Sequence, residues 1–174
     1  SLQSGSDTVL QRMHRRYDTA RYLESVRLLR QYFPGCAVTT DLIVGFPGET
    51  EEEFGQSLDF LRTCGLSMFH IFPYSRRSGT PAYDFPDQVH EREKQDRSRK
   101  MNALAEDIRR DVLKGYEGME DEVLLETPLS ETLFTGYTRL YVPVVVSAPG
   151  HKSGEIVRVR LGAYDGERVR AVLC

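Results

Sequence analysis

Apolar residues in the first part of the chain recur at helical spacing and then gather in a short run. Residues 7–16 are predicted to form a short helix, and a second helix begins with Asp18 or Thr19 as a candidate N-cap. Its apolar face is formed by Tyr22, Val26, Leu29 and Phe33. Residues 36–45 are mostly apolar and rich in β-branched side chains, which predicts a parallel strand buried on both faces.

The same alternation occurs once more further along the chain. Thr50 and Glu53 have the spacing of a capping box, and the helix that they begin is predicted to end near Gly65. A short apolar strand follows at residues 68–73. Helix and strand alternating at this spacing predict βα repeats of a parallel sheet. Two strands alone do not make a stable open sheet, so further strands are expected beside them.

A loop and a long charged helix complete this part. Residues 74–89 contain two of the eight prolines and show no period, so they are predicted to be loop. Residues 90–114 are predicted to be helical. The apolar stripe of this helix consists of Met101, Leu104, Ala105, Ile108 and Val112. The dense charges at residues 97–100 are expected to form a solvated face.

Beyond residue 114 the pattern changes to short β-prone runs separated by turns. The runs are residues 122–127, 133–137, 140–146, 155–161 and 168–173. Five short strands in about 60 residues predict a small barrel of the oligonucleotide-binding (OB) type. The fold class is therefore α/β plus all-β, with a βα part at residues 1–114 and a five-stranded barrel at residues 115–174.

Composition and charge narrow the possible classes of function. The chain has 174 residues, of which 40% are hydrophobic and 28% are charged, as in ordinary globular proteins. Residues 1–114 carry 17 basic and 17 acidic residues, and residues 115–174 carry 6 and 9. Neither part has the positive charge of a strong non-specific nucleic-acid binder, so any RNA contact must come from a local patch.

The cysteines, the histidines and the start of the chain add little chemistry. Three cysteines lie far apart, which argues against a disulfide framework and a cysteine metal site, and favours a reducing cytoplasm. The four histidines have no ligand spacing. No apolar run approaches the ~20 residues that cross a bilayer, so no membrane contact is expected. The chain does not open on Met and is expected to begin inside an element.

The segment at residues 41–50 is the most informative for chemistry. A predicted strand ends in a glycine-rich turn and a capped helix begins, and ligands of βα proteins bind at that carboxyl end. Gly45 and Gly48 would let the backbone approach a ligand, while Asp41 and Glu49 could hold ribose hydroxyls or an ammonium group. The spacing fits neither a phosphate-binding loop nor a dinucleotide fingerprint. On spacing alone, a plain turn with a helix cap is the favoured interpretation.

Arginines alternate with apolar residues in the last two predicted strands. Arg158 and Arg160 lie on one face of the strand at 155–161, and Arg168 and Arg170 lie on one face of the last strand. Two neighbouring arginine faces on a small barrel could bind an RNA backbone weakly. Exposed arginines that only keep the protein soluble are the alternative.

Three segments in this order resemble the radical S-adenosylmethionine tRNA methylthiotransferases, the MiaB/MtaB group. They are Leu-Gln-Ser-Gly-Ser-Asp at residues 2–7, Thr-Asp-Leu-Ile-Val-Gly-Phe-Pro-Gly-Glu-Thr at residues 40–50 and Phe-Pro-Tyr-Ser-Arg-Arg-Ser-Gly-Thr-Pro at residues 72–81. The resemblance covers almost the whole chain. The β-rich end resembles the TRAM domain, an RNA-binding module that those enzymes carry at the C-terminus.

The resemblance implies a fold and a set of cofactors. Residues 1–114 would be the C-terminal portion of a partial (βα) radical-SAM barrel, and residues 115–174 would be an OB-like TRAM barrel. Those enzymes use S-adenosylmethionine and two [4Fe-4S] clusters, one of them held by Cys-x-x-x-Cys-x-x-Cys. This motif is absent from the chain, so no metal ligand and no catalytic residue is assigned. The chain would be the back half of such an enzyme and inactive alone.

The resemblance also implies cofactor-binding residues, which would position reactants rather than transfer protons. These are Gln3 and Ser4 near the cofactor ribose or the substrate, Asp41, Ile43, Gly45 and Glu49 near the adenosyl group, and Tyr74, Ser75 and Arg77 near the adenine. The partner would be tRNA at its anticodon stem-loop.

Residues 72–75 and residues 136–138 near Tyr141 are most similar to the MtaB branch, which methylthiolates C2 of threonylcarbamoyladenosine beside the anticodon. The branch that acts on isopentenyladenosine is one alternative. A non-catalytic RNA-binding module is the alternative for the chain by itself. The sequence predicts no oligomeric state.

Overall fold

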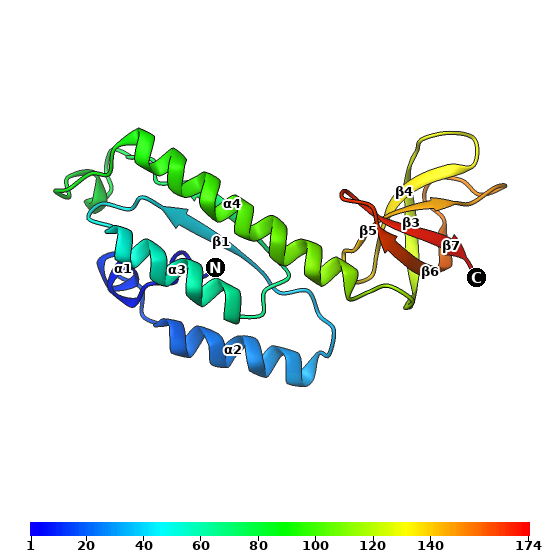
Figure 1. Ribbon diagram of the computed structural model, residues 1–174, viewed down its shortest axis with the longest axis horizontal. Helices are drawn as coiled ribbons and strands as arrows, with labels where there is room; N and C mark the ends of the chain where they lie inside the picture. The colour runs from blue at the N-terminus through cyan, green and yellow to red at the C-terminus, as the bar shows by residue number, and fades with distance from the viewer. The chain divides into compact units, whose positions relative to one another are not determined.

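A computed structural model describes residues 1–174 and shows two compact units, Ser1–Ile108 and Arg109–Cys174 (Figure 1). Helix α4, Glu91–Lys114, carries the chain from one unit into the other. Its end coincides with the change of pattern seen in the sequence. The assignment of the two parts to named domains stays a prediction.

The first unit contains the predicted βα alternation. Its elements before α4 are α1 (Asp7–Arg12), α2 (Thr19–Tyr32), β1 (Thr39–Val44), α3 (Glu51–Thr63), β2 (Met68–Pro73) and the short 3-10 helix η1 (Pro81–Tyr83). The capping box of α3 is confirmed, since Thr50 Oγ1 accepts from the Glu53 amide and the Glu53 carboxylate accepts from the Thr50 amide. The predicted cap of α2 is also confirmed, with Asp18 accepting from the Arg21 amide at 2.7 Å.

Strands β1 and β2 form a two-stranded parallel sheet, in register from Thr39 opposite Met68 to Val44 opposite Pro73. Gln3 adds a parallel bridge to Leu42, so the chain start lies along the other edge of β1. The structure therefore contains a further, single-residue piece of the parallel sheet that the sequence pattern requires.

The prediction that β1 is buried on both faces is wrong. Thr40, Leu42 and Val44 are buried, whereas Asp41 and Ile43 between them are only half-buried. The buried face packs under α2, α3 and α4, and Figure 1 shows β1 beside α3 and α4. The other face stays accessible because it lines a cavity.

Other boundaries differ from the predictions at the ends of elements. The helix predicted at residues 7–16 ends at Arg12, and His14 adopts a φ of 56°, which no α-helix continues. The strand predicted at residues 36–45 begins only at Thr39. The core of this unit is made by residues from the chain start, α2, β1, α3, β2 and α4, including Leu2, Val26, Leu42, Phe54, Leu61, Phe69 and Met101.

The second unit is a closed five-stranded barrel. Its strands are β3 (Glu120–Pro128), β4 (Leu133–Thr138), β5 (Pro143–Ser147), β6 (Ile156–Tyr164) and β7 (Val169–Leu173), in the order β3-β4-β5-β7-β6. β3 also pairs with β6, which closes the barrel, and β5 and β7 are its one parallel pair. All five predicted strands are present, with ends that shift by up to three residues.

The barrel core follows the alternation seen in the sequence. Val157, Val159 and Leu161 point inward, while Ile156, Arg158 and Arg160 are exposed. The same rule buries residues of the other strands, among them Val123, Leu125, Val144, Val146 and Val169.

Candidate functional site

A cavity of about 540 Å³ lies at the carboxyl ends of β1 and β2. Because both strands are parallel, their last residues meet at one edge of the sheet, where ligands of βα proteins bind. The cavity is lined by Gln3, Asp41, Ile43, Phe72, Pro73, Tyr74, Ser75, Arg77, Thr80 and Ala82. Six of the nine predicted cofactor-binding residues are therefore brought together: Gln3, Asp41, Ile43, Tyr74, Ser75 and Arg77.

A smaller cavity of about 190 Å³ shares part of this wall, including Ile43 and Tyr74. Its aromatic lining is ordered by edge-to-face contacts, with the Tyr74 and Phe46 ring centroids 5.3 Å apart and those of Phe46 and Phe85 6.2 Å apart. The Tyr74 hydroxyl is buried and has no hydrogen-bond partner. A buried hydroxyl of this kind is expected to bond to a ligand or to water.

The polar groups around the two cavities suit a purine nucleoside. Aromatic and apolar walls accept a base, and the few polar side chains fix its orientation. Gln3, Asp41 and Arg77 line the larger cavity, and their amide, carboxylate and guanidinium groups can bond to hydroxyl, amino or anionic groups. Gln3 and His14 line the two cavities with φ values of 69° and 56°, a strained conformation that clusters at functional sites. S-adenosylmethionine therefore fits the residues that are present.

The other three predicted cofactor-binding residues, Ser4, Gly45 and Glu49, lie outside the lining of the larger cavity. Ser4 is 2% exposed, and its hydroxyl lies 3.3 Å from that of Ser57 on α3. Gly45 has a φ of 70°, and a Cβ built there would lie 2.5 Å from Cγ of Lys94. Gly45 and Glu49 belong to the turn after β1, whereas Ser4 contacts α3, and the predicted contact of all three with a cofactor stays a prediction.

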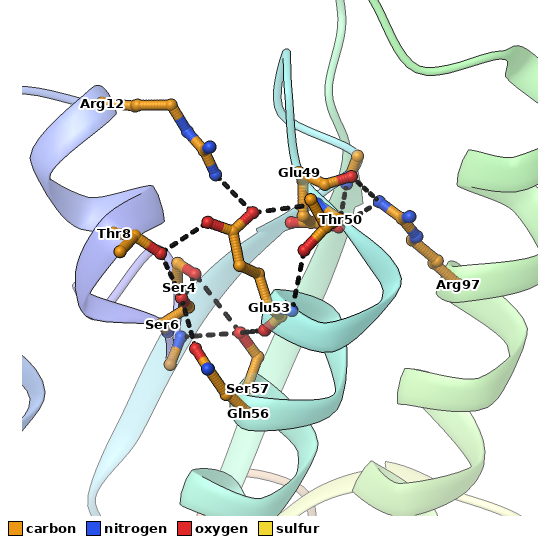
Figure 2. Close-up of polar contacts among 12 residues, drawn as sticks. Ser4, Ser6, Thr8, Arg12, Glu49, Thr50, Glu53, Gln56, Ser57 and Arg97 are labelled. Atoms are coloured by element: carbon orange, nitrogen blue, oxygen red, sulfur yellow. Dashed lines mark hydrogen bonds and ion pairs between the residues drawn. The ribbon is translucent and has the colours of Figure 1, made fainter.

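Glu49 belongs to a buried ion pair with Arg97 of α4 (Figure 2). Its Oε1 accepts from the Gly45 amide at 3.0 Å and from Arg97 Nη1 at 2.7 Å, and Arg97 also donates to the Glu49 carbonyl. Both side chains are 2% exposed. Burial raises the pKa of Glu49, against the lowering effects of the Gly45 amide and Arg97. The pair ties the glycine turn to α4.

The expectation that residues 97–100 form a solvated face is wrong for Arg97. Its side chain is among the most deeply buried of the chain, although Arg99 on the same helix is 80% exposed. Arg97 lies four residues before Met101, so it continues the apolar stripe toward the start of the helix. The four-residue spacing therefore indicated that Arg97 is buried, although its charge suggested an exposed position.

A second polar network joins α1 to α3 (Figure 2). The Glu53 carboxylate accepts from Thr8 and from Arg12, each at 2.5 Å, in addition to its capping bond with Thr50. Ser6 extends the network to Gln56 with a 2.9 Å bond. Burial alone would raise the pKa of Glu53, but the bonds from Arg12, Thr8 and Thr50 outweigh it and hold that pKa below its usual value.

Replacing Glu53 with glutamine is expected to weaken the first unit by about 1–2 kcal/mol at pH 7, because charge-assisted bonds are lost. A lowered folded-state pKa adds stability above the usual glutamate value and loses it as pH falls through the folded value. The difference between wild type and Glu53→Gln should therefore shrink in acid. Urea unfolding followed by circular dichroism at pH 7 and pH 3 measures this difference in the free energy of unfolding. An equal difference at both values would contradict the assignment, and Glu52→Gln is the exposed control.

The four arginines predicted to bind RNA lie on the barrel, each near a carboxylate. Arg158 and Arg160 both pair with Glu120, at 3.1 and 2.9 Å. Arg168 lies 3.4 Å from Glu167 and Arg170 lies 3.8 Å from Asp165. Their positive charge is thus partly compensated. Their role in RNA binding stays a prediction.

The structure contains no group of three or more His, Cys, Asp or Glu side chains that could hold a metal ion. Cys36, Cys64 and Cys174 are free, and burial raises the pKa of Cys64 to about 11. An iron–sulfur cluster therefore does not fit the residues of this chain. No helix is both long and apolar enough to cross a membrane.

The comparisons with known proteins agree with the motifs. Residues 1–61, which contain Gln3 and the whole of β1, match the Radical SAM superfamily. The resemblance to the tRNA methylthiotransferases is confirmed, since the chain is similar over almost its whole length to members of both branches.

Three relatives illustrate the similarity. The threonylcarbamoyladenosine tRNA methylthiotransferase MtaB of Bacillus subtilis is 41% identical over 98% of this chain and 40% of its own length. The tRNA-2-methylthio-N(6)-dimethylallyladenosine synthase of the same species is 39% identical over 97% of this chain and 34% of its own length. The corresponding synthase of Finegoldia magna is 42% identical over 94% of this chain and 36% of its own length. The chain thus spans two fifths or less of these relatives.

Proposed function

We propose that this chain is the part of a radical S-adenosylmethionine tRNA methylthiotransferase that positions the cofactor and contacts the tRNA. The observation that carries the proposal is the cavity at the ends of β1 and β2, where the family motifs converge. The product would carry a methylthio group at C2 of a hypermodified adenosine beside the anticodon, most simply threonylcarbamoyladenosine. The same cleft in an isopentenyladenosine enzyme is the second candidate, since relatives of both kinds match.

The residues of this chain would act by binding and orientation. Ile43 and the Tyr74 region would pack against the adenine, Gln3 and Asp41 would hold polar groups of the sugar or the amino acid, and Arg77 would bind an anionic group. When bound, S-adenosylmethionine supplies the methyl group and the radical that activates the substrate. The ligands of the two [4Fe-4S] clusters would come from elsewhere in the enzyme.

The barrel would be a TRAM domain with an OB-like fold. Five strands, a closed barrel and a single parallel pair between the third and fifth strands support this proposal. Its partner would be tRNA at the anticodon stem-loop, which also suits a cytoplasmic location. If this chain acts alone, it would serve as a non-catalytic RNA-binding module.

Deleting the gene that encodes this chain is expected to remove a methylthio group from one tRNA nucleoside, as measured by mass spectrometry of digested tRNA. The side chain of the nucleoside that loses the group, threonylcarbamoyl or isopentenyl, decides between the two candidates. The wild-type gene should restore the group, and Ile43→Arg should restore at most a tenth of it, because arginine would fill the cavity. Leu28→Arg, at a site that is 53% exposed, is the matched control. An unchanged nucleoside profile after deletion would rule the proposal out.

A further inference from the structure

Two tyrosines on the outside of the barrel form an exposed aromatic pair. Tyr137 lies at the end of β4 and Tyr141 in the turn that follows, with ring centroids 5.9 Å apart and planes tilted by 46°. Tyr141 is 80% exposed, more than any other large apolar side chain, and Tyr137 is 39% exposed. The pair therefore presents aromatic surface that the barrel core does not use.

The turn holds Tyr141 in a conformation that does not serve packing. Thr138 is buried, and its hydroxyl accepts from the amides of Leu140 and Val142, while its carbonyl accepts from the Tyr141 amide at 3.0 Å. Tyr141 has a φ of 60°, in the left-handed region that is costly for residues other than glycine. Because the ring is exposed, burial does not offset that cost. Strain of this kind is typical of residues held in place for a ligand.

The strand register places one cation on the same outer face. Tyr137 is opposite Pro143, and two residues further along β5 Val145 is opposite Arg170 of β7. Standard strand geometry puts the Tyr137 and Arg170 Cα atoms about 12 Å apart. Arg170 is exposed, and its nearest carboxylate oxygen, on Asp165, is 3.8 Å from Nε, which is beyond hydrogen-bond distance. Its donors remain available to a phosphate.

We propose that Tyr137 and Tyr141 stack against bases of single-stranded RNA, with Arg170 contacting the backbone. The proposal rests on the proposed tRNA-modifying function and names the surface that it would use. Residues 115–174 carry 6 basic and 9 acidic residues, so bulk charge does not hold a polyanion there. Stacking between bases and aromatic side chains does not depend on a positively charged surface, because every base has an aromatic face. OB-type barrels bind oligonucleotides on their second and third strands, which are β4 and β5 here.

The chain offers its own reporter for the test, because it contains no tryptophan. In Tyr141→Trp, a short single-stranded RNA or an anticodon stem-loop is expected to quench the fluorescence on binding. The affinity of the same RNA for the wild-type protein and for variants without the tryptophan is then compared by fluorescence anisotropy of a labelled RNA strand. Tyr137→Ala with Tyr141→Ala should weaken binding at least tenfold, whereas the double phenylalanine variant should bind within about twofold of wild type.

Two further variants make the test specific. Tyr32→Ala removes a tyrosine that is 69% exposed on α2 and should leave RNA binding unchanged. Arg170→Gln should reduce the magnitude of the slope of log affinity against log salt by about 0.7, as expected for one lost phosphate contact with a single strand. Circular dichroism of each variant should match wild type.

The outcomes separate this inference from the proposed function. Absence of RNA binding by the wild-type chain would count against the RNA-contacting role in the proposed function, and the inference would fall with it. RNA binding that the double alanine variant retains would overturn the inference alone. A concentration-dependent dimer that this variant abolishes, without a change in RNA affinity, would show that the tyrosines contact a second copy and would also overturn it.

Discussion

Replacing Arg97 with methionine is expected to destabilise the first unit by about 3–5 kcal/mol at pH 7, the usual result of removing one member of a buried ion pair. Methionine fills a similar volume, so the loss is mainly electrostatic. The Glu49 carboxylate, 2% exposed, would keep only the Gly45 amide as a partner. The glycine turn after β1 would lose its ion pair with α4.

The pH dependence of this variant has a definite sign. Burial already raises the pKa of Glu49, and removing Arg97 also removes two of the effects that lower it. A folded-state pKa raised above the unfolded value contributes stability below the unfolded value and loses it as pH rises through the folded value. The destabilisation of Arg97→Met relative to wild type should therefore be largest at neutral pH and smaller near pH 4.5. Urea unfolding, followed by the circular dichroism signal of the helices, measures the destabilisation at both pH values.

Two variants control the experiment. Arg99→Met makes the same substitution at an 80% exposed site on the same helix, where an ion pair with Asp96 is worth at most about 1 kcal/mol. Glu49→Gln combined with Arg97→Met removes both charges and should be more stable at pH 7 than Arg97→Met alone. If Arg97→Met proved as stable as Arg99→Met, the burial of this pair would not matter for the fold.

The fold followed from the sequence wherever local chemistry decided the structure. The capping box at Thr50 and the strand at residues 68–73 depend on neighbouring residues alone, and both are confirmed. The five barrel strands were recognisable because apolar and polar residues alternate and turns separate them. The end of the first helix was missed because His14 has a positive φ without being glycine or asparagine.

The sequence predicted residues that line the candidate site, but it did not predict the buried ion pair that holds the neighbouring turn in place. Asp41 belongs to the strand and turn segment at residues 41–50, Tyr74 was implied by the resemblance to the family, and both line the cavity. The four-residue spacing from Met101 indicates that Arg97 is buried, but periodicity does not reveal its ion-pair partner, Glu49, which is 48 residues away. Exposure of the Asp41 and Ile43 face was missed for a related reason, since an apolar strand pattern does not say how many neighbours cover it.

Replacing Gly136 with alanine is expected to unfold the barrel or to destabilise it by about 3 kcal/mol or more, as severe overpacking does. A Cβ at this position would lie 2.0 Å from the carbonyl oxygen of Leu124 on β3. The clash is with backbone rather than with a flexible side chain, and both strands are fixed by a closed barrel. A unit of this size has little stability to lose. Amide resonances of residues 115–174 should lose their dispersion while those of the first unit keep theirs.

The same substitution elsewhere should have the opposite effect. Gly55 lies inside α3 with no atom within 4 Å of a built Cβ, so Gly55→Ala should stabilise the first unit by about 0.5–1 kcal/mol. Gly136→Ala should in addition abolish RNA binding, because Tyr137 follows directly and its position depends on β4 pairing with β3. A Gly136→Ala protein with a dispersed barrel spectrum and unchanged melting temperature would contradict the close approach of the two strands. Retained RNA binding in a protein whose barrel had unfolded would place the RNA contact in the first unit instead.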